Sequence, residues 1–386
     1  MSNNLDVLFN QAGNVWVPNW FKLFSNNEKG GFHERIDSDG SPIDLPRRLL
    51  TQCRQIIVYS NALQDNPQDT QYAAKLEEGF SFVKENYHVP ETGGSIFSID
   101  AEGKPADTKY DLYGHAFILL ACAAYSKVND NPEINEFAKT TLNFIKDNFR
   151  FEQGEGFVEA LGEDMKPLPE MRRQNPHMHL MEASVYMYEA SSDQDYLDMA
   201  NEMLELFFDK LYDPETKTLG EFFNDDFTHH DTDGQLVEAG HHAEWVWLLK
   251  RYQEVSASKD PRITETMNDL FDFVVKHGID PEYGGVYDEQ NRDGSVVKAD
   301  KRIWPGLETM RAAAIMANDD AYADQARKVV EDMVTLYQDK YIDFETGKWN
   351  EYLERDLSVK TDYRPGTTPY HIFPVLREAA GYMPKV

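Results

Sequence analysis

The chain has 386 residues, and its 22 Phe, 20 Tyr and 6 Trp provide for a large apolar core. Its formal net charge of -30 at pH 7 argues against nucleic acids and anionic membranes as partners, because both are themselves negatively charged. Cys53 and Cys122 are too few for a disulfide scaffold and lie in apolar helical patterns, which predicts buried free thiols. No basic leader precedes an apolar run, and no stretch has the length of a membrane span, so we expect a soluble, cytoplasmic protein.

Helical periodicity recurs along the whole chain, with apolar residues three and four positions apart. Counting these periodic segments along the chain predicts about twelve helices. They cover residues 3–24, 46–65, 68–87, 107–129, 132–149, 175–192, 193–211, 236–256, 261–277, 299–318, 319–338 and 367–381. No Pro-, Gly- or Ser-rich linker separates them, so we expect a single catalytic domain over residues 1–386.

Two kinds of helix alternate in this series. Every second pattern is apolar around most of its circumference, as in residues 116–121 and 312–317, which is typical of a buried helix. The patterns between them keep a polar face, as in residues 71–78. Inner and outer helices that alternate with a repeat of roughly sixty residues predict an all-α fold, an (α/α)6 barrel of six inner and six outer helices.

A glycine-containing segment follows most of the helix pairs. Each segment places one or two glycines before aromatic or aliphatic residues, and most are followed by an acidic tip. The segments cover residues 91–97, 153–158, 218–223, 283–287 and 346–350. This pattern predicts short β-hairpins or tight loops inserted between the helices.

Polar and ionisable residues recur near one end of the inner helices, about once in each helical pair. In a closed barrel these positions converge on the axis, so the side chains are expected to line one funnel. The set comprises Arg54, Tyr113, His115, Asn175, His179, His241, Glu244, Trp304, Glu308 and His371. Because histidine titrates near neutral pH, this composition favours proton-transfer chemistry. For His115, a hydrogen-bonded core position is the competing interpretation.

Spacing separates some of these histidines from their neighbours. His177 and His179 are two residues apart and point in different directions on a helix, so at most one of them faces the axis. His179 precedes Glu182, and His241 precedes Glu244, by three residues, which places each pair on one helical face. A carboxylate in that position fixes the tautomer of an imidazole, although a purely structural ion pair has the same spacing.

Several other chemistries lack their sequence signals. The histidines do not show the HExxH spacing of zinc enzymes, and paired CxxC motifs are absent. Neither a phosphate-binding glycine loop in the right context nor a GxSxG nucleophile motif occurs. We therefore expect neither a metal ion nor an organic cofactor.

Five motifs in chain order resemble the N-acylglucosamine 2-epimerase superfamily. They lie at residues 47–55, 175–183, 240–245, 301–305 and 369–372, so the resemblance extends over nearly the whole chain. The resemblance implies the same (α/α)6 barrel. Residues 175–179 (Asn-Pro-His-Met-His) and 240–245 (Gly-His-His-Ala-Glu-Trp) differ from the forms typical of the cellobiose and acylglucosamine epimerases. They look most like the D-mannose isomerase branch, with Ala239 where the acylglucosamine epimerases usually have proline.

The resemblance also implies residue roles. Its catalytic residues correspond here to His179, His241, Glu244 and His371. Its substrate-binding residues correspond to Arg54, Tyr113, Asn175, Trp304 and Glu308. It implies a small neutral monosaccharide as the partner and interconversion of D-mannose and D-fructose, or of related sugars such as D-lyxose, through a cis-enediol. In that reaction His371 is the base between C1 and C2, and His241, oriented by Glu244, serves ring opening.

Other functions stay open at this stage. A 2-epimerase acting on N-acylglucosamine, mannose, glucose or cellobiose would use His241 and His371 on opposite faces of the sugar. A glycoside hydrolase would need two axial carboxylates, for which Glu182, Glu244 and Glu308 are the candidates. A non-catalytic sugar-binding protein would have no use for three ionisable histidines on inner helices. The oligomeric state is open between a monomer and a homodimer.

Overall fold

The computed structural model describes residues 4–151 and 154–383, which form two compact units that interleave along the chain. Unit 1 consists of Met1–Lys22, Tyr212–Glu221 and Gln235–Val386, and unit 2 consists of Leu23–Leu211 and Phe222–Gly234. The single domain expected over residues 1–386 stays a prediction. Residue 3 of the first expected helix and residue 153 of the second expected turn lie outside the described residues.

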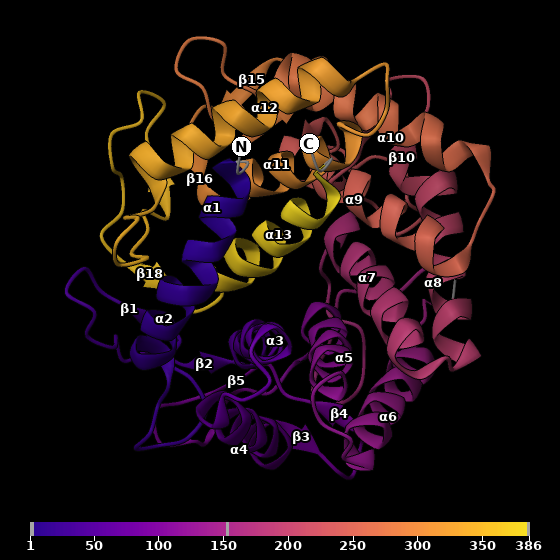
Figure 1. Cartoon of the computed structure of the whole chain (residues 1–386). Helices are drawn as coiled ribbons and strands as arrows, with labels where there is room; N and C mark the ends of the chain where they lie inside the picture. The colour runs from indigo at the N-terminus through magenta and orange to yellow at the C-terminus, as the bar shows by residue number, and fades with distance from the viewer. Residues whose placement is uncertain (1–3, 152–153, 384–386) are drawn as a thin grey trace. The chain divides into compact units, whose positions relative to one another are not determined.

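Unit 2 is a series of helical hairpins, drawn from indigo to magenta in Figure 1. Its buried helices are α3 (Leu49–Asp65), α5 (Leu112–Ser126) and α7 (Gln174–Ser191). Its outer helices are α4 (Thr70–Asn86), α6 (Pro132–Asn148) and α8 (Gln194–Leu206), the last continued by a π-helical turn at Phe207–Leu211. Helix α5 packs against both α3 and α7, and each outer helix packs on the buried helix that precedes it.

Unit 1 repeats the arrangement. Its buried helices are α9 (Ala239–Ser256), α11 (Ile303–Met316) and α13 (Pro369–Tyr382). Its outer helices are α10 (Pro261–Phe273) and α12 (Ala323–Leu336), continued by π turns at Val274–Gly278 and Tyr337–Tyr341. The N-terminal helix runs through α1 (Asn4–Gln11), a π turn at Ala12–Trp16 and α2 (Val17–Phe24). Helix α11 packs against α9 and α13, and α1 lies beside α13 (indigo and yellow in Figure 1).

Most outer helices begin at an acidic or amide cap. Asp69, Asn131, Asp193 and Asp260 each accept a hydrogen bond from the backbone N–H two residues further on, which satisfies a donor that the helix leaves free. The buried helices instead begin after a two-residue strand. This strand is why the expected starts at residues 46, 107, 236 and 299 lie several residues too early.

The strands are short and join the turn segments to the starts of the buried helices. In unit 2, β2 (Arg47–Arg48) pairs with β5 (Ser98–Ile99), β7 (Tyr110–Asp111) with β8 (Ala160–Leu161), and β9 (Arg172–Arg173) with β12 (Phe222–Phe223), all antiparallel. In unit 1, β13 (Leu236–Val237) pairs with β14 (Glu289–Asn291), and β16 (Lys301–Arg302) with β17 (Tyr352–Leu353). None of these pairs is a hairpin, because the paired strands lie far apart in the chain. Hairpins are present at two of the expected segments, where residues 88–89 pair with 94–95 and residues 212–213 pair with 218–219.

The remaining strands complete these small sheets. Strand β6 (Pro105–Asp107) adds to β5, and β15 (Val296–Lys298) adds to β14. Two further antiparallel pairs are β3 (His88–Val89) with β4 (Gly94–Ser95) and β10 (Tyr212–Asp213) with β11 (Thr218–Leu219). Strand β1 covers Arg35–Ile36, and β18 covers Arg364–Pro365.

A repeated side-chain acceptor fixes four of the turns to their buried helices. Gln52 Oε1 accepts the N–H of Phe32 at 2.8 Å. The Nε2 atoms of three histidines accept equivalent backbone N–H groups at 3.0 to 3.1 Å, and these histidines are His115, His177 and His242. Each of the three donates from Nδ1 to the carbonyl four residues earlier. This confirms the core interpretation of His115 and defines a class of structural histidines, because a buried backbone donor without an acceptor is costly.

Two expectations from composition can be compared with the structure. Cys53 and Cys122 are buried free thiols, as expected. Among the described residues no helix combines the length and the apolar character needed to cross a bilayer.

Candidate active site

All of the expected site residues except His241 and His371 occupy two register positions of the buried helices. Counting starts at the residue that precedes each helix, namely Arg48, Asp111, Arg173, Glu238 and Arg302. The second position after it holds Tyr113, Asn175 and Trp304. The sixth position holds Arg54, Phe117, His179, Glu244 and Glu308. Positions four residues apart lie one turn apart on one helical face, so each helix presents both to the same side.

His241 on α9 lies among carboxylates. Its Nδ1 donates to both carboxylate oxygens of Glu221, each at 3.0 Å, and lies 3.6 Å from Glu238 Oε2. Burial opposes protonation of this ring, but the negative charges of Glu221 and Glu238 outweigh it and raise the pKa of His241 to about 9. The ring is therefore an imidazolium at neutral pH.

His371 on α13 has a different partner. Its Nδ1 donates to Glu308 Oε1 at 3.0 Å. The other oxygen of Glu308 accepts from Arg311, which also donates to Glu378 at 2.8 Å and stacks on Trp247 with 3.5 Å to the ring centroid. Arg311 therefore compensates the charge of Glu308, the carboxylate that holds His371.

Trp304 lies between these two histidines. Its ring centroid is 4.9 Å from that of His241 and 5.6 Å from that of His371, with interplanar angles of 39° and 36°. Unit 1 thus brings together two carboxylate-held imidazoles and an indole. An indole face is a common platform for the apolar face of a sugar ring, and the imidazoles supply proton donors and acceptors.

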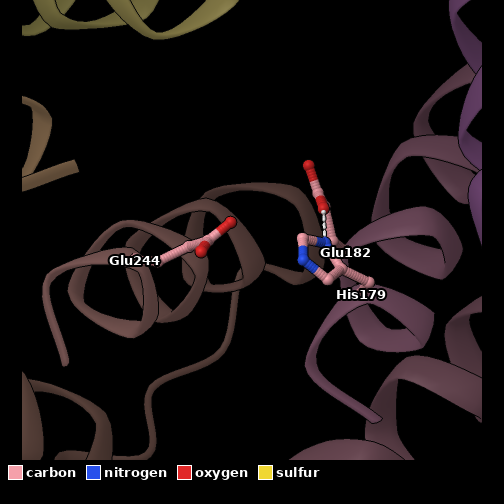
Figure 2. Close-up of side chains that lie close together, drawn as sticks. All are labelled: His179, Glu182 and Glu244. Carbon is pink, nitrogen blue, oxygen red and sulfur yellow. Dashed lines mark hydrogen bonds and ion pairs between the residues drawn. The ribbon is translucent and has the colours of Figure 1, made fainter. Parts of the chain in front are cut away.

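Unit 2 holds its own group of expected residues. Arg54 donates to the Tyr113 hydroxyl at 2.8 Å and lies over the Phe117 ring at 4.5 Å. The ring of His179 contacts Tyr113, with 5.0 Å between centroids, and its Nδ1 donates to Glu182 at 2.7 Å. Figure 2 shows the His179–Glu182 hydrogen bond. The shared face predicted for this pair is confirmed.

Two further expected residues have their own features. Asn175 lies in the first turn of α7, and its buried Oδ1 has no hydrogen-bond partner among the described residues, so this acceptor is available to a ligand. Glu244 on α9, also drawn in Figure 2, raises the pKa of His241 through its charge. The hydrogen bonds of His241 Nδ1 go to Glu221, however, and not to Glu244 as the sequence suggested.

Glu221 is a site residue that sequence reasoning missed. It lies in the turn segment at residues 218–223, twenty residues before its partner in the chain. The available signal was the repeat itself, because equivalent turns carry Glu34, Glu159, Asp288 and Glu351. A carboxylate that recurs at one loop position in most hairpins indicates a shared structural role.

Two clusters in unit 1 have the ligand types of a metal site. The possible ligand atoms of Glu221, Glu238 and His241 lie within 4.8 Å of one another, as do those of Glu244, Glu308 and His371. In each cluster, however, an arginine already neutralises one carboxylate: Arg302 donates to Glu238 at 2.7 Å, and Arg311 donates to Glu308. These carboxylates are thus compensated by protein cations, and the metal-free site stays our prediction.

Comparison with known proteins identifies the family. The model of the N-acylglucosamine 2-epimerase (GlcNAc 2-epimerase) family matches residues 30–374. A mannose-6-phosphate isomerase of Rhizobium meliloti (strain 1021) is 28% identical over 369 residues, 94% of this chain and 93% of the relative. A cellobiose 2-epimerase of Ruminococcus albus is 27% identical over 383 residues, 92% of each chain. A crystal structure of D-mannose isomerase matches with a TM-score of 0.87 at 21% identity, over 98% of this chain and 97% of that one.

The chain belongs to the N-acylglucosamine 2-epimerase family, as its motifs predicted. The likeness to solved structures confirms the expected fold class, the all-α (α/α)6 barrel. It is an enzyme of a family whose members act on sugars as isomerases or epimerases.

Proposed function

We propose that this protein is an aldose–ketose isomerase that interconverts D-mannose and D-fructose without a metal ion, and that it works in the cytoplasm. The observation that carries the proposal is the pair of carboxylate-held histidines, His241 and His371, on either side of Trp304. Relatives named as isomerases of mannose and of mannose 6-phosphate support this reaction type.

The two histidines have different tasks in this reaction. His241, as an imidazolium, protonates the ring oxygen when the sugar opens and takes up the proton that leaves the O1 hydroxyl, so that it is an imidazolium again. His371 then removes the proton from C2, the electron pair forms the C1–C2 double bond, and O1 takes a proton from His241. The resulting cis-enediol returns its O2 proton to His241 and takes the proton held by His371 at C1, which completes the ketose.

In this proposal the remaining expected residues either bind the sugar or act on the catalytic histidines. Trp304 supports the ring, and Arg54, held by Tyr113, stabilises the oxyanion that develops at the carbonyl oxygen. Asn175 offers its free acceptor to a sugar hydroxyl. Glu308 holds His371, His179 is held by Glu182, and Glu244 adds negative charge near His241.

A 2-epimerase is the second candidate. Moving a proton from one face of C2 to the other needs two bases, and two histidines that flank one indole satisfy that need. The cellobiose 2-epimerase relative favours it.

Product analysis tests the proposal. The protein is treated with EDTA and incubated in D2O with D-mannose, and in parallel with D-mannose 6-phosphate and cellobiose. D-Fructose carrying deuterium supports the isomerase. Glucose formed from mannose without fructose, or glucosyl-mannose formed from cellobiose, transfers the proposal to 2-epimerase. No conversion of any of the three sugars contradicts both.

A further inference from the structure

Carboxylates on the turn segments clamp the starts of several buried helices. Glu34 accepts from the backbone N–H of Arg48 at 2.9 Å and from its Nε at 2.7 Å. Glu159 accepts from the N–H and Nε of Arg173 at 2.7 and 2.9 Å. In each clamp the carboxylate lies fourteen residues before the arginine. A bidentate, charge-assisted contact of this kind fixes the helix start relative to its turn.

The fourth hairpin departs from this pattern. Its turn carboxylate is Glu221, but the residue that precedes the helix is Glu238 instead of an arginine. Arg302 of the next hairpin, itself paired with Asp288, donates to Glu238 at 2.7 Å. Glu221 is therefore not used in a clamp with the helix start, and both of its oxygens accept from His241.

We propose that Glu221 is a positioning residue for His241, a role that rests on the proposed function and extends it. The carboxylate holds the hydrogen of the imidazole on Nδ1 and fixes the plane of the ring. Nε2 is then the atom of His241 that exchanges protons with the sugar. The equivalent carboxylates Glu34 and Glu159 hold the start of a buried helix, whereas Glu221 serves acid–base chemistry.

The charges around His241 support this division of tasks. Glu221 faces the ring from the turn after β11, Glu238 from the start of α9, and Glu244 from the next turn of α9. Two arginines lie close to two of these carboxylates. Arg302 binds Glu238, and Arg292, which donates to Thr218 Oγ1 at 2.8 Å, lies near Glu221. Since His241 Nδ1 donates to both oxygens of Glu221, this carboxylate is the partner whose loss changes the ring most.

The test compares two matched substitutions. Glu221→Gln keeps the shape and an acceptor oxygen but removes the charge. Glu159→Gln makes the same change at the equivalent turn of the third hairpin, where the carboxylate clamps Arg173. The readouts are the pH profile of kcat, kcat against KM for the preferred sugar, and the NMR titration of the His241 ring protons.

We expect Glu221→Gln to lower kcat by 10- to 100-fold with less than a threefold change in KM. The alkaline limb of the profile should move to lower pH, because the imidazolium loses the charge that stabilises it. The His241 titration should move in the same direction. Glu159→Gln should leave the positions of the limb and of the titration as in the native protein. Glu221→Asp, which restores the charge, should recover part of kcat and tests the idea if the glutamine variant fails to fold.

Either of two results would overturn the inference. One is an unchanged His241 titration in Glu221→Gln. The other is an equal shift of the profile in both glutamine variants, which would assign Glu221 a structural role only. The NMR titration needs no turnover, so a failure of the proposed isomerase reaction is distinguishable from a failure of the positioning role.

Discussion

Two adjacent residues of α9 show how differently the same side chain is used. The pKa of His241 is raised to about 9, whereas that of its neighbour His242 is lowered to about 4 by burial. Both rings are buried. They differ in their partners, because His241 meets the carboxylate of Glu221, and His242 meets the backbone N–H of Leu219 and the carbonyl of Glu238. Neutral partners leave the burial cost of a charge uncompensated, and carboxylates overcome it.

The same contrast separates two sets of histidines across the chain. The structural set is His115, His177 and His242, each bound to backbone groups and each with its pKa lowered to about 4 by burial. The site set is His179, His241 and His371, each with Nδ1 on a carboxylate. The partner of Nδ1, and not the degree of burial, distinguishes a catalytic candidate from a structural residue here.

Loss of catalysis is the largest effect expected from this contrast. Removing either flanking histidine, by His241→Ala or His371→Ala, should lower kcat by roughly 10²- to 10⁴-fold, because each supplies a general acid or base. The far-ultraviolet circular dichroism should stay native. Near-native turnover in either variant, measured on the sugar that the wild type converts best, would remove that residue from the mechanism.

Alkaline pH tests the charge of His241 through stability. Its folded pKa of about 9 lies above the ordinary histidine value of 6.5, so its contribution is fully present below pH 6.5 and is lost as the pH rises through 9. The full contribution is about 3 kcal/mol, because every tenfold gain in proton affinity on folding is equivalent to about 1.4 kcal/mol. The free energy of urea unfolding should therefore fall more steeply between pH 6.5 and 9 in the wild type than in His241→Gln. Parallel curves would contradict the assignment.

Acid should lower the free energy of unfolding through the three structural histidines, whereas alkaline pH lowers it through His241. Their folded pKa values lie below 6.5, so the unfolded chain binds protons first, and stability falls as the pH decreases from 6.5 toward 4. Each ring contributes about 2 kcal/mol of this loss at pH 5. The matched variant is His242→Gln, since Gln52 already holds the equivalent turn N–H. It should be less sensitive to acid than the wild type, and an equal loss in both proteins would contradict a neutral His242.

Removal of the acceptor itself sharpens the comparison at neutral pH. His242→Ala leaves the buried N–H of Leu219 without an acceptor and should cost about 1–3 kcal/mol of unfolding free energy. His242→Gln should cost less, and both should keep the kcat of the folded fraction. A large loss of kcat in the glutamine variant would place His242 in the catalytic site after all.

The smallest effect is expected at Tyr113 on α5 of unit 2. Tyr113→Phe removes one hydrogen bond from Arg54, the residue that stabilises the oxyanion in our proposal, and should lower kcat about fivefold, equivalent to roughly 1 kcal/mol, with little change in KM. Steady-state kinetics on the preferred sugar measure both constants. A rise in KM with constant kcat would mean that the contact serves substrate binding and not the oxyanion.

The sequence predicted the helices well because their periodicity is long. The alternation of buried and outer helices is present, and most of the outer helices start within two residues of the expected position, as α6 and α10 do. The starts of the buried helices other than α7 were placed too early, since a strand of two residues has no period to detect. The two units could not be predicted from the sequence, because they interleave along the chain and no linker separates them.

Contacts within one helix were easier to predict than contacts between segments. The pairing of His179 with Glu182 followed from a spacing of three residues. The partners of His241 and His371 could not be found in this way, because Glu221 and Glu308 lie 20 and 63 residues away in the chain. His241 and Glu244 have the same spacing of three, yet the nearer carboxylate in space comes from the turn. Local spacing gives candidates, and tertiary packing selects among them.

The side-chain acceptors that hold four of the turns also affect how this fold can diversify in evolution. Because Gln52 and three histidines do the same structural work two residues before the sixth register position, and so on the opposite side of the helix, the hairpins hold their shape independently of the side chains facing the site. Arginine, phenylalanine, histidine and glutamate occupy that sixth position in successive hairpins without altering the turn. Evolution can therefore exchange the reactive groups one hairpin at a time, and new sugar chemistries become accessible at little risk to folding.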